Sequence, residues 1–308
     1  MQGNADHVCL IELPWSFRTR DILAFHGRDP LSLAERVSVD TLQKGLAWQG
    51  RAACLTLRFH LRHVEAELAI DGTPVQHEAA ALAAMVRRML GLTQRIDDFE
   101  QSYRMHPQLG PLIGRRPGLR VPLSPTPFEA LTGAVVGQQI NVIAAVALRR
   151  RLIQAAGLVH SSGLACYPDA RRLVCLSEAE LRQAGLSRTK AQTLSALSRL
   201  VQEELLPLAT WTETLPVEEI RAQLLNVRGV GPWTVNYALL RGYGWLDGSL
   251  HGDAAVRRGL QTLLGETEIV TEEYAQRWLA GFSPWRALIA AHLWAMRPSD
   301  GDSGMPSG

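Results

Sequence analysis

The sequence predicts a mainly helical protein with an N-terminal α+β domain. Three observations support this fold class: strand-like segments occur early, a proline-rich segment follows over 110–128, and helix start signals dominate the rest. A length of 308 residues and a hydrophobic fraction of 46% allow two or three ordinary globular cores. We therefore expect an N-terminal domain over 1–115, a helical region of two subdomains over 116–297, and a disordered tail over 298–308.

Alternating apolar and polar residues identify the N-terminal domain. Residues 8–13 and 53–61 read as strands. In the second segment Leu55, Leu57 and Phe59 alternate with polar residues, which is the period of a sheet with one solvated face. Residues 16–25 and 77–90 have helical periodicity, so a small α+β domain is predicted.

Capping signals identify the helices of the second region. The run Thr126-Pro127-Phe128-Glu129 combines an N-cap, a proline at the first helical position and a glutamate at the third. Residues 177–180 repeat the capping-box pattern. Further helices are expected over 187–205, 217–226, 232–241, 253–264, 272–279 and 284–296.

Composition argues against several classes of protein. Four cysteines without CxxC spacing indicate neither a zinc site, an iron–sulfur cluster nor a disulfide framework. The N-terminus does not resemble a signal peptide, and no apolar run approaches the roughly 18 residues of a membrane span, so we expect a cytoplasmic protein without a membrane partner. Residues 115–260 contain 17 Lys and Arg against 11 Asp and Glu, which favours a polyanion partner. The arginines at 149–151 read equally well as a solvated helix face.

The stretch LNVRGVGPWTVNY, residues 225–237, places Gly229 and Gly231 between two apolar helical runs. Glycines at this spacing allow positive φ, so a tight helical hairpin is predicted. Backbone N–H groups at the start of the second helix, together with the helix dipole, form an anion site suited to a nucleic-acid phosphate. A plain helical hairpin with a glycine-rich turn is the alternative.

A second motif follows 16 residues after this stretch, where Gly252 precedes Asp253 and an apolar run. Taken alone, the aspartate is most simply a helix N-cap. In combination with the hairpin, the motif indicates a particular protein family.

These segments resemble the helix-hairpin-helix and Gly/Pro-Asp (HhH-GPD) superfamily of DNA glycosylases, and most of all its bacterial AlkA type, 3-methyladenine DNA glycosylase II. The matching segments are 127–140, 225–242, Gly252-Asp253 and 277–286. The resemblance extends over nearly the whole chain to about residue 297 and implies the HhH-GPD glycosylase fold.

The resemblance implies a monofunctional DNA glycosylase of base excision repair. Such an enzyme flips alkylated bases, such as 3-methyladenine and 7-methylguanine, out of the duplex and hydrolyses the N-glycosidic bond to leave an abasic site. Asp253 would be the essential carboxylate, stabilising oxocarbenium character in the sugar. Members that also cleave the strand use a lysine where this chain has Trp233, so no lyase activity is expected. The alternatives are a non-catalytic HhH DNA-binding protein and a glycosylase for another class of damaged base.

The resemblance also implies roles for residues around these motifs. An aromatic pocket would hold the cationic base by stacking and cation–π attraction, and its members would be Trp233, Tyr237, Trp285 and Phe25. Core packing is the alternative for each of these rings. Contacts with DNA would come from Gly229, Gly231, Thr234, Gln138 and Gln139, with Gln139 as the wedge that replaces the flipped base. For the glutamines a buried polar pair is the alternative, and Thr234 reads equally well as a residue that only begins a helix.

We also have expectations for the cofactor, the binding partner and the cellular location of the protein. No cofactor is required, although the resemblance implies a structural Na⁺ or K⁺ held by the backbone carbonyls of Leu225, Val227 and Val230. The expected partner is double-stranded DNA containing damaged bases, bound by a monomer associated with a bacterial nucleoid. A general-base role for His251, beside Asp253, is not required by the resemblance.

Overall fold

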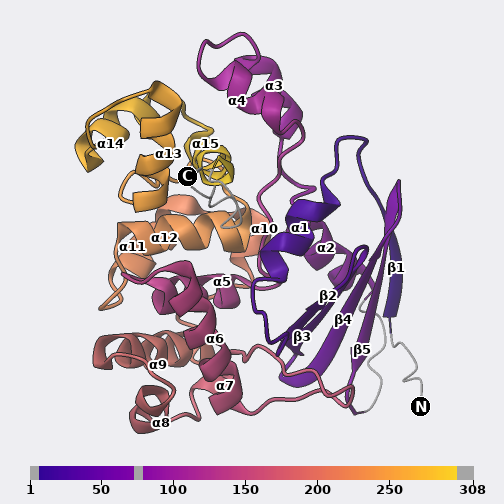
Figure 1. Cartoon of the computed structure of the whole chain (residues 1–308). Helices are drawn as coiled ribbons and strands as arrows, with labels where there is room; N and C mark the ends of the chain where they lie inside the picture. The colour runs from indigo at the N-terminus through magenta and orange to yellow at the C-terminus, as the bar shows by residue number, and fades with distance from the viewer. Residues whose placement is uncertain (1–6, 73–78, 297–308) are drawn as a thin grey trace, which may run out of the picture. The chain divides into compact units, whose positions relative to one another are not determined.

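The computed structural model describes residues 7–72 and 79–296, which form two compact units (Figure 1). The first unit contains the chain up to Gln94 together with Arg120–Gly244, and the second contains Arg95–Leu119 together with the chain from Trp245 onward. This division differs from the boundary expected after residue 115. Residues 95–119 belong to the second unit because of aromatic packing. The Phe99 ring lies 5.8 Å from that of Trp285 and 5.6 Å from that of His292. The expected tail over 298–308 and the start of the helix expected over 77–90 lie outside the described residues.

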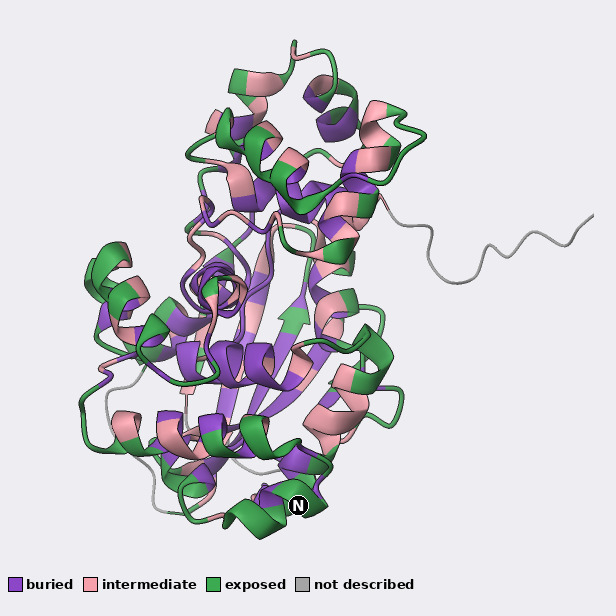
Figure 2. Ribbon diagram, turned by 90° about the vertical axis from the view of Figure 1, so that its left-hand side faces the viewer, coloured by how far each residue is buried: buried purple, intermediate pink, exposed green. Residues whose placement is uncertain are grey.

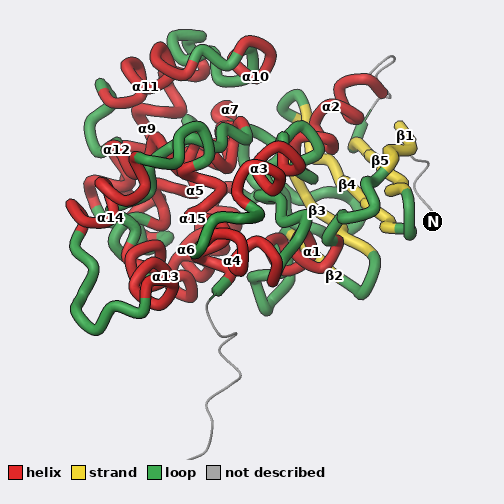
Figure 3. The backbone as a smooth tube through the Cα atoms, turned by 90° about the horizontal axis from the view of Figure 1, so that it is seen from above, coloured by secondary structure: helices red, strands yellow, loops and turns green. Residues whose placement is uncertain are grey.

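The first unit contains a five-stranded antiparallel sheet of order β1-β5-β4-β3-β2, drawn in yellow in Figure 3. The strands are β1 (His7–Glu12), β2 (Glu35–Val37), β3 (Thr41–Trp48), β4 (Arg51–Phe59) and β5 (His63–Ile70). Of these, only β1 and β4 were named from the sequence. In β5 buried and half-buried residues alternate, whereas residues 52–57 of β4 are all buried, so the solvated face expected for β4 is wrong there and holds only at Arg58. In β3 the buried Lys44 and the adjacent Gly45 interrupt the alternation of apolar and polar residues.

Two helices cover one face of this sheet. They are α1 (Thr19–His26) and α2 (Ala79–Met89), and their apolar side chains share one core with the strands. Figure 2 shows the buried positions along the strands in purple. On the other face, residues 158–167 cover one end of the sheet. A Cβ at Gly45 would lie 2.1 Å from the carbonyl oxygen of Ala165, so only glycine permits this close approach.

The remaining helices of the first unit follow the capping signals. Thr126 accepts a hydrogen bond from the Glu129 N–H, and Ser177 and Glu180 form the expected capping box. The expected helix over 232–241 divides into an α-helical and a π-helical part. The helices are α5 (Pro127–Gly137), α6 (Val142–Ala156), α7 (Ala170–Leu173), α8 (Glu178–Gln183), α9 (Arg188–Gln202), α10 (Trp211–Thr214), α11 (Val217–Leu225), α12 (Pro232–Ala238) and the π-helix η1 (Leu239–Tyr243).

A buried ion network links the sheet to α5 and α6. Lys44 Nζ lies 2.5 Å from Glu35 Oε1 and 2.8 Å from Glu129 Oε1, and Arg149 Nη2 pairs with the same two oxygens at 2.6 and 2.9 Å. Arg150 pairs with a buried aspartate, Asp29, at 2.9 Å. Neither sequence-based interpretation of the arginines at 149–151 therefore holds for these two, because both are committed to ion pairs inside the unit.

The second unit is helical. Its members are α3 (Ile96–Tyr103), α4 (Leu109–Arg115), α13 (Ala254–Leu264), α14 (Glu272–Ala280) and α15 (Arg286–Ala295). Helices α13 and α15 approach closely at Gly259, where a Cβ would lie 2.8 Å from the carbonyl oxygen of Leu293. This close approach brings the start of α13 near the end of α15.

Two expectations from composition can be compared with the structure. All four cysteines are free, as the absence of a disulfide pattern predicted. Among the described residues, none of the helices has the length and apolar character needed to cross a membrane.

Candidate functional site

The turn over 226–231 joins α11 to α12 and is held by α9. Gly229 has φ +88°, and a Cβ there would lie 2.2 Å from Thr193 Oγ1. The Thr193 hydroxyl donates to the carbonyl oxygen of Arg228 across 2.9 Å. Gly229 is therefore required both by its backbone conformation and by its contact with α9.

Gly231 serves a different purpose in the same turn. Its φ is −109°, so the expectation of positive φ is confirmed for Gly229 and wrong for Gly231. Within the part of the chain that the structure describes, no atom outside the local backbone lies within 4 Å of an added Cβ. The missing side chain at 231 thus leaves the start of α12 approachable from solvent.

Gln138 connects the end of α5 to this turn. Its Nε2 donates to the Gly229 carbonyl oxygen at 2.9 Å and to Thr234 Oγ1 at 2.7 Å. Lys190 Nζ donates to the carbonyl oxygens of Val136 and Gln138 at 2.9 and 2.8 Å. Thr234 is only 2% exposed, so the structure gives its expected bond to a phosphate no support. The contacts of Gln138 and Thr234 are those of an internal polar pair.

Gln139 lies on the surface of the turn between α5 and α6. It is exposed and has φ +57°, a conformation that is uncommon for a residue with a side chain. Three apolar residues follow it with large exposed fractions, Ile140 at 38%, Val142 at 55% and Ile143 at 78%. Residues 139–143 are therefore an exposed, largely apolar segment, of which sequence reasoning singled out only Gln139.

Trp233 and Tyr237 stack on one face of α12. Their ring centroids are 5.1 Å apart with an interplanar angle of 25°, as the spacing of four residues predicts. Both residues are only half-buried, so the pair is not part of a closed core.

Arg241 links this aromatic pair to the N-terminal domain. Its guanidinium carbon lies 4.5 Å from the ring centroid of Phe25 and 5.9 Å from that of Tyr237. The side chain is 6% exposed and donates to the carbonyl oxygen of Pro122 at 2.8 Å. Burial lowers the pKa of Arg241 to about 10, so it stays a cation at neutral pH. In the sequence, Arg241 lies within the matching segment 225–242, but sequence reasoning did not assign it a role.

Asp253 caps α13 in the second unit. Its Oδ1 accepts hydrogen bonds from the N–H groups of Ala255 and Val256 at 2.8 and 3.0 Å, which confirms the N-cap prediction. The same oxygen accepts from Nε1 of Trp294, on α15, at 3.2 Å. The residue is half-buried. Three donors thus orient this carboxylate.

Trp294 is a functional candidate that sequence reasoning missed. That reasoning selected Trp285, whose ring lies 5.8 Å from that of Phe99. The two tryptophans are nine residues apart on the same helical segment. Only the packing of α15 against α13 at Gly259 brings Trp294 into hydrogen-bonding contact with Asp253. The expectation that Trp285 lines an aromatic pocket receives no support from this contact.

His251 is engaged by groups other than Asp253. Its Nδ1 lies 2.8 Å from Ser249 Oγ, and its Nε2 lies 3.7 Å from Glu272 Oε1. These contacts place the ring against the start of α14 and give no support to a general-base role.

The carbonyl groups proposed for a monovalent cation belong to the last residue of α11, Leu225, and to Val227 and Val230 in the turn that follows. The Val227 carbonyl oxygen accepts the N–H of Val230 at 3.0 Å, which leaves its second lone pair for another partner. Neutral carbonyl oxygens suit Na⁺ or K⁺, so the turn is compatible with such an ion. Backbone carbonyl ligands leave no side-chain signature in the sequence.

Comparison with known proteins agrees with these observations. Residues 132–284 match the family described as HhH-GPD superfamily base excision DNA repair protein, and residues 12–124 match the AlkA N-terminal domain. DNA-3-methyladenine glycosylase 2 of Escherichia coli (strain K12) is 30% identical over 221 residues, which is 70% of this chain and 74% of that protein.

Two solved structures share the fold. The 3-methyladenine DNA glycosylase from Archaeoglobus fulgidus has a TM-score of 0.78 at 22% identity, covering 93% of this chain and 97% of that one. The 8-oxoguanine glycosylase/lyase of Clostridium acetobutylicum, in complex with double-stranded DNA, has a TM-score of 0.69 at 12% identity, covering 93% and 96%. With both family matches and this relative, the chain belongs to the HhH-GPD superfamily of base excision DNA repair proteins.

Proposed function

We propose that this protein is a monofunctional DNA glycosylase that removes alkylated bases from double-stranded DNA, acts as a monomer and leaves an abasic site. The observation that carries the proposal is the carboxylate of Asp253, fixed by two backbone N–H groups and the indole of Trp294. The E. coli relative, named DNA-3-methyladenine glycosylase 2, supports alkylated bases as the substrate class.

Asp253 would act on the sugar of the damaged nucleotide. As the N-glycosidic bond breaks, its electron pair leaves with the base, and positive charge develops at C1′ and the ring oxygen. A carboxylate already held in one orientation stabilises that charge without reorganising, and it can align the water that attacks C1′ and accept its proton. An alkylated purine with a positive charge departs as a neutral base, so no second carboxylate is needed to protonate it.

Trp233 and Tyr237 would bind the flipped base. Their half-buried stack offers electron-rich ring surface to solvent, and cationic purines are attracted to such surfaces. Arg241 contacts the rings of Phe25 and Tyr237 by cation–π interactions, which would keep the rings in place. We therefore retain Phe25 as a pocket residue and regard Arg241 as a positioning residue.

The hairpin would dock on the DNA backbone through the start of α12. Gly231 leaves that surface open, Gly229 shapes the turn, and Gln138 and Thr234 hold it to α5. Gln139 is proposed as the wedge, because it is exposed at the start of the exposed, largely apolar segment 139–143. Carbonyl groups at 225, 227 and 230 would hold a Na⁺ or K⁺ ion beside the phosphate. Phosphate contacts of this kind predict that DNA affinity falls steeply as salt rises.

Strand cleavage is not part of the proposal. A lyase needs a free amine to form a Schiff base with the sugar, and Trp233 stands where lyases of the superfamily have that lysine. The chain contains only two lysines. Lys44 is buried in the ion network, and Lys190 donates to two carbonyl oxygens at the end of α5.

The deciding experiment incubates wild type and Asp253→Asn with methylated duplex DNA and measures released bases and strand breaks separately. Asparagine caps a helix as well as aspartate does, so the variant should fold normally. Release of 3-methyladenine or 7-methylguanine by wild type alone, with breaks only after alkali, would support the proposal. DNA binding without release by either protein would refute it and favour a non-catalytic DNA-binding protein. Release of 8-oxoguanine instead would assign the enzyme to another lesion class.

A further inference from the structure

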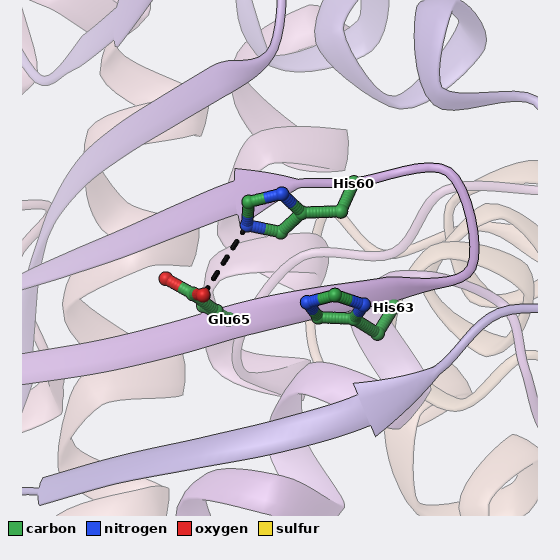
Figure 4. Close-up of side chains that lie close together, drawn as sticks. All are labelled: His60, His63 and Glu65. Carbon is green, nitrogen blue, oxygen red and sulfur yellow. Dashed lines mark ion pairs between the residues drawn. The ribbon is translucent and has the colours of Figure 1, made fainter.

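The turn between β4 and β5 carries two histidines and a glutamate that the proposed function does not use. Figure 4 shows the side chains of His60, His63 and Glu65 on the same side of the hairpin. His60 Nε2 lies 3.3 Å from Glu65 Oε1, and one ligand atom from each residue lies within 4.8 Å of the other two. The imidazole rings are stacked, with centroids 4.4 Å apart and planes 18° from parallel.

The backbone of the β4–β5 hairpin brings these residues together. The His60 N–H donates to the His63 carbonyl oxygen at 2.9 Å and closes the turn. The pairing of Phe59 with Val64 fixes the register of β4 against β5. His63 and Glu65 are two residues apart on one strand and so point to the same face of the sheet. That face is the one opposite the core, which keeps all three groups accessible.

The chemistry of the three groups suits a divalent transition-metal ion. Imidazole is a common ligand of Zn²⁺, Cu²⁺ and Ni²⁺, and a carboxylate completes many zinc sites. Ligands about 2.0–2.1 Å from a tetrahedral zinc ion lie roughly 3.3–3.5 Å from one another. The distance between His60 Nε2 and Glu65 Oε1 already has this value. His63 must turn out of its stack on His60 to direct a ring nitrogen at the same ion, and its half-exposed ring allows this movement.

The neighbouring charges leave Glu65 available to the two histidines. Arg58 lies opposite Glu65 on β4, but its Nη1 is paired with Glu67 Oε2 at 2.7 Å. The guanidinium of Arg62, within the turn, lies 3.8 Å from the ring centroid of Trp15. On β1, Glu12 faces His63 and adds a second negative charge beside the cluster. A cation bound here would therefore meet an environment of net negative character.

We propose that His60, His63 and Glu65 form a binding site for a zinc-like divalent metal ion, with water in the remaining coordination position. The ion would connect the end of β4 to the start of β5 and so stabilise this edge of the sheet. The site is independent of the proposed glycosylase chemistry, and neither depends on the other.

The test uses the full chain without a histidine tag, treated with chelator and then titrated with zinc chloride by calorimetry. Three variants each remove one ligand: His60→Ala, His63→Ala and Glu65→Gln. Glu268→Gln is the matched control, because it removes a carboxylate at an exposed position outside the cluster and leaves the Arg58–Glu67 pair intact. Unchanged melting temperatures in the presence of chelator verify that these surface variants fold.

The expected result is one zinc ion per chain in wild type and Glu268→Gln, with an affinity about tenfold or more lower in each ligand variant. Zinc should also raise the melting temperature of wild type but not that of His63→Ala. Wild type that binds no zinc would overturn the proposal. Equal affinity in wild type and the three ligand variants would overturn it as well, because the ion would then be bound elsewhere.

Discussion

The indole Nε1 of Trp294 donates a hydrogen bond to Oδ1 of Asp253 across 3.2 Å. The two residues are 41 positions apart, at the end of α15 and just before α13. They meet because Gly259 permits α13 to approach the backbone of α15. The orientation of the proposed catalytic carboxylate therefore depends on helix packing within the second unit as well as on the cap of α13.

Replacing Trp294 with phenylalanine should slow base excision without weakening DNA binding. The variant keeps an aromatic ring, although a smaller one, and loses the indole N–H. A hydrogen bond to a charged group contributes about 1.5–3 kcal/mol, so the single-turnover rate should fall roughly 10- to 100-fold. Trp278→Phe is the control, because Trp278 packs on Phe282. Equal losses in the two variants would attribute the effect to helix packing instead of the hydrogen bond.

The two hairpin glycines should respond differently to substitution by alanine. Gly229→Ala should lower the free energy of unfolding by about 1–2 kcal/mol through its positive φ alone, with a further cost from the contact with Thr193. Gly231→Ala should leave stability unchanged and weaken DNA binding, because its Cβ would point where a phosphate is proposed to lie. Urea unfolding and DNA affinity at fixed salt measure the two effects. Undiminished DNA affinity in Gly231→Ala would argue against the docking surface.

The protein should not form a covalent adduct with DNA. Incubation with DNA containing an abasic site, followed by borohydride reduction, traps the Schiff base of a lyase. We expect no trapped complex, since Trp233 cannot form one and both lysines are held by other groups. If a complex is trapped, its loss in Lys190→Arg would identify Lys190 as the nucleophile.

Gln139 should matter for duplex substrates and not for single strands. A wedge fills the gap left by a flipped base, and a single strand has no such gap. Gln139→Ala should therefore reduce excision from duplex DNA by about tenfold, the effect of some 1.4 kcal/mol, and leave excision from single-stranded DNA unchanged. Gln154→Ala, at an exposed glutamine on α6, is the control. An equal loss on both substrates would contradict the wedge assignment.

The buried ion network should make stability depend on pH in the acid range. Burial alone would raise the pKa of Glu35, but Arg149 and Lys44 beside it hold that pKa well below its usual value. A depressed carboxyl pKa contributes stability that is fully present above the unfolded value of about 4.3 and is lost progressively as pH falls from there through the lower pKa of the folded state. The free energy of unfolding should thus decrease from about pH 5 downward. Glu35→Gln should be less stable at pH 7 and show a shallower decrease, whereas parallel curves for the two proteins would contradict this assignment.

Features that rest on neighbouring residues were predicted well from the sequence. The caps at Thr126, Ser177 and Asp253 are hydrogen bonds spanning two or three residues, and each forms as expected. The stack of Trp233 on Tyr237 follows from their spacing on a helix. The order of the motifs was specific enough to identify the superfamily and the fold.

Contacts between residues far apart in the sequence could not be predicted from local sequence patterns. Arg149 meets Glu35 across 114 positions of sequence, and no local pattern distinguishes that pairing from a solvated helix face. The same holds for Trp294, which only the approach of two helices singles out from Trp285. Local hydrogen bonding and periodicity thus specify caps, helices and the family motifs. The partners of buried charges and the orientation of the proposed catalytic carboxylate depend on packing between segments far apart in the chain.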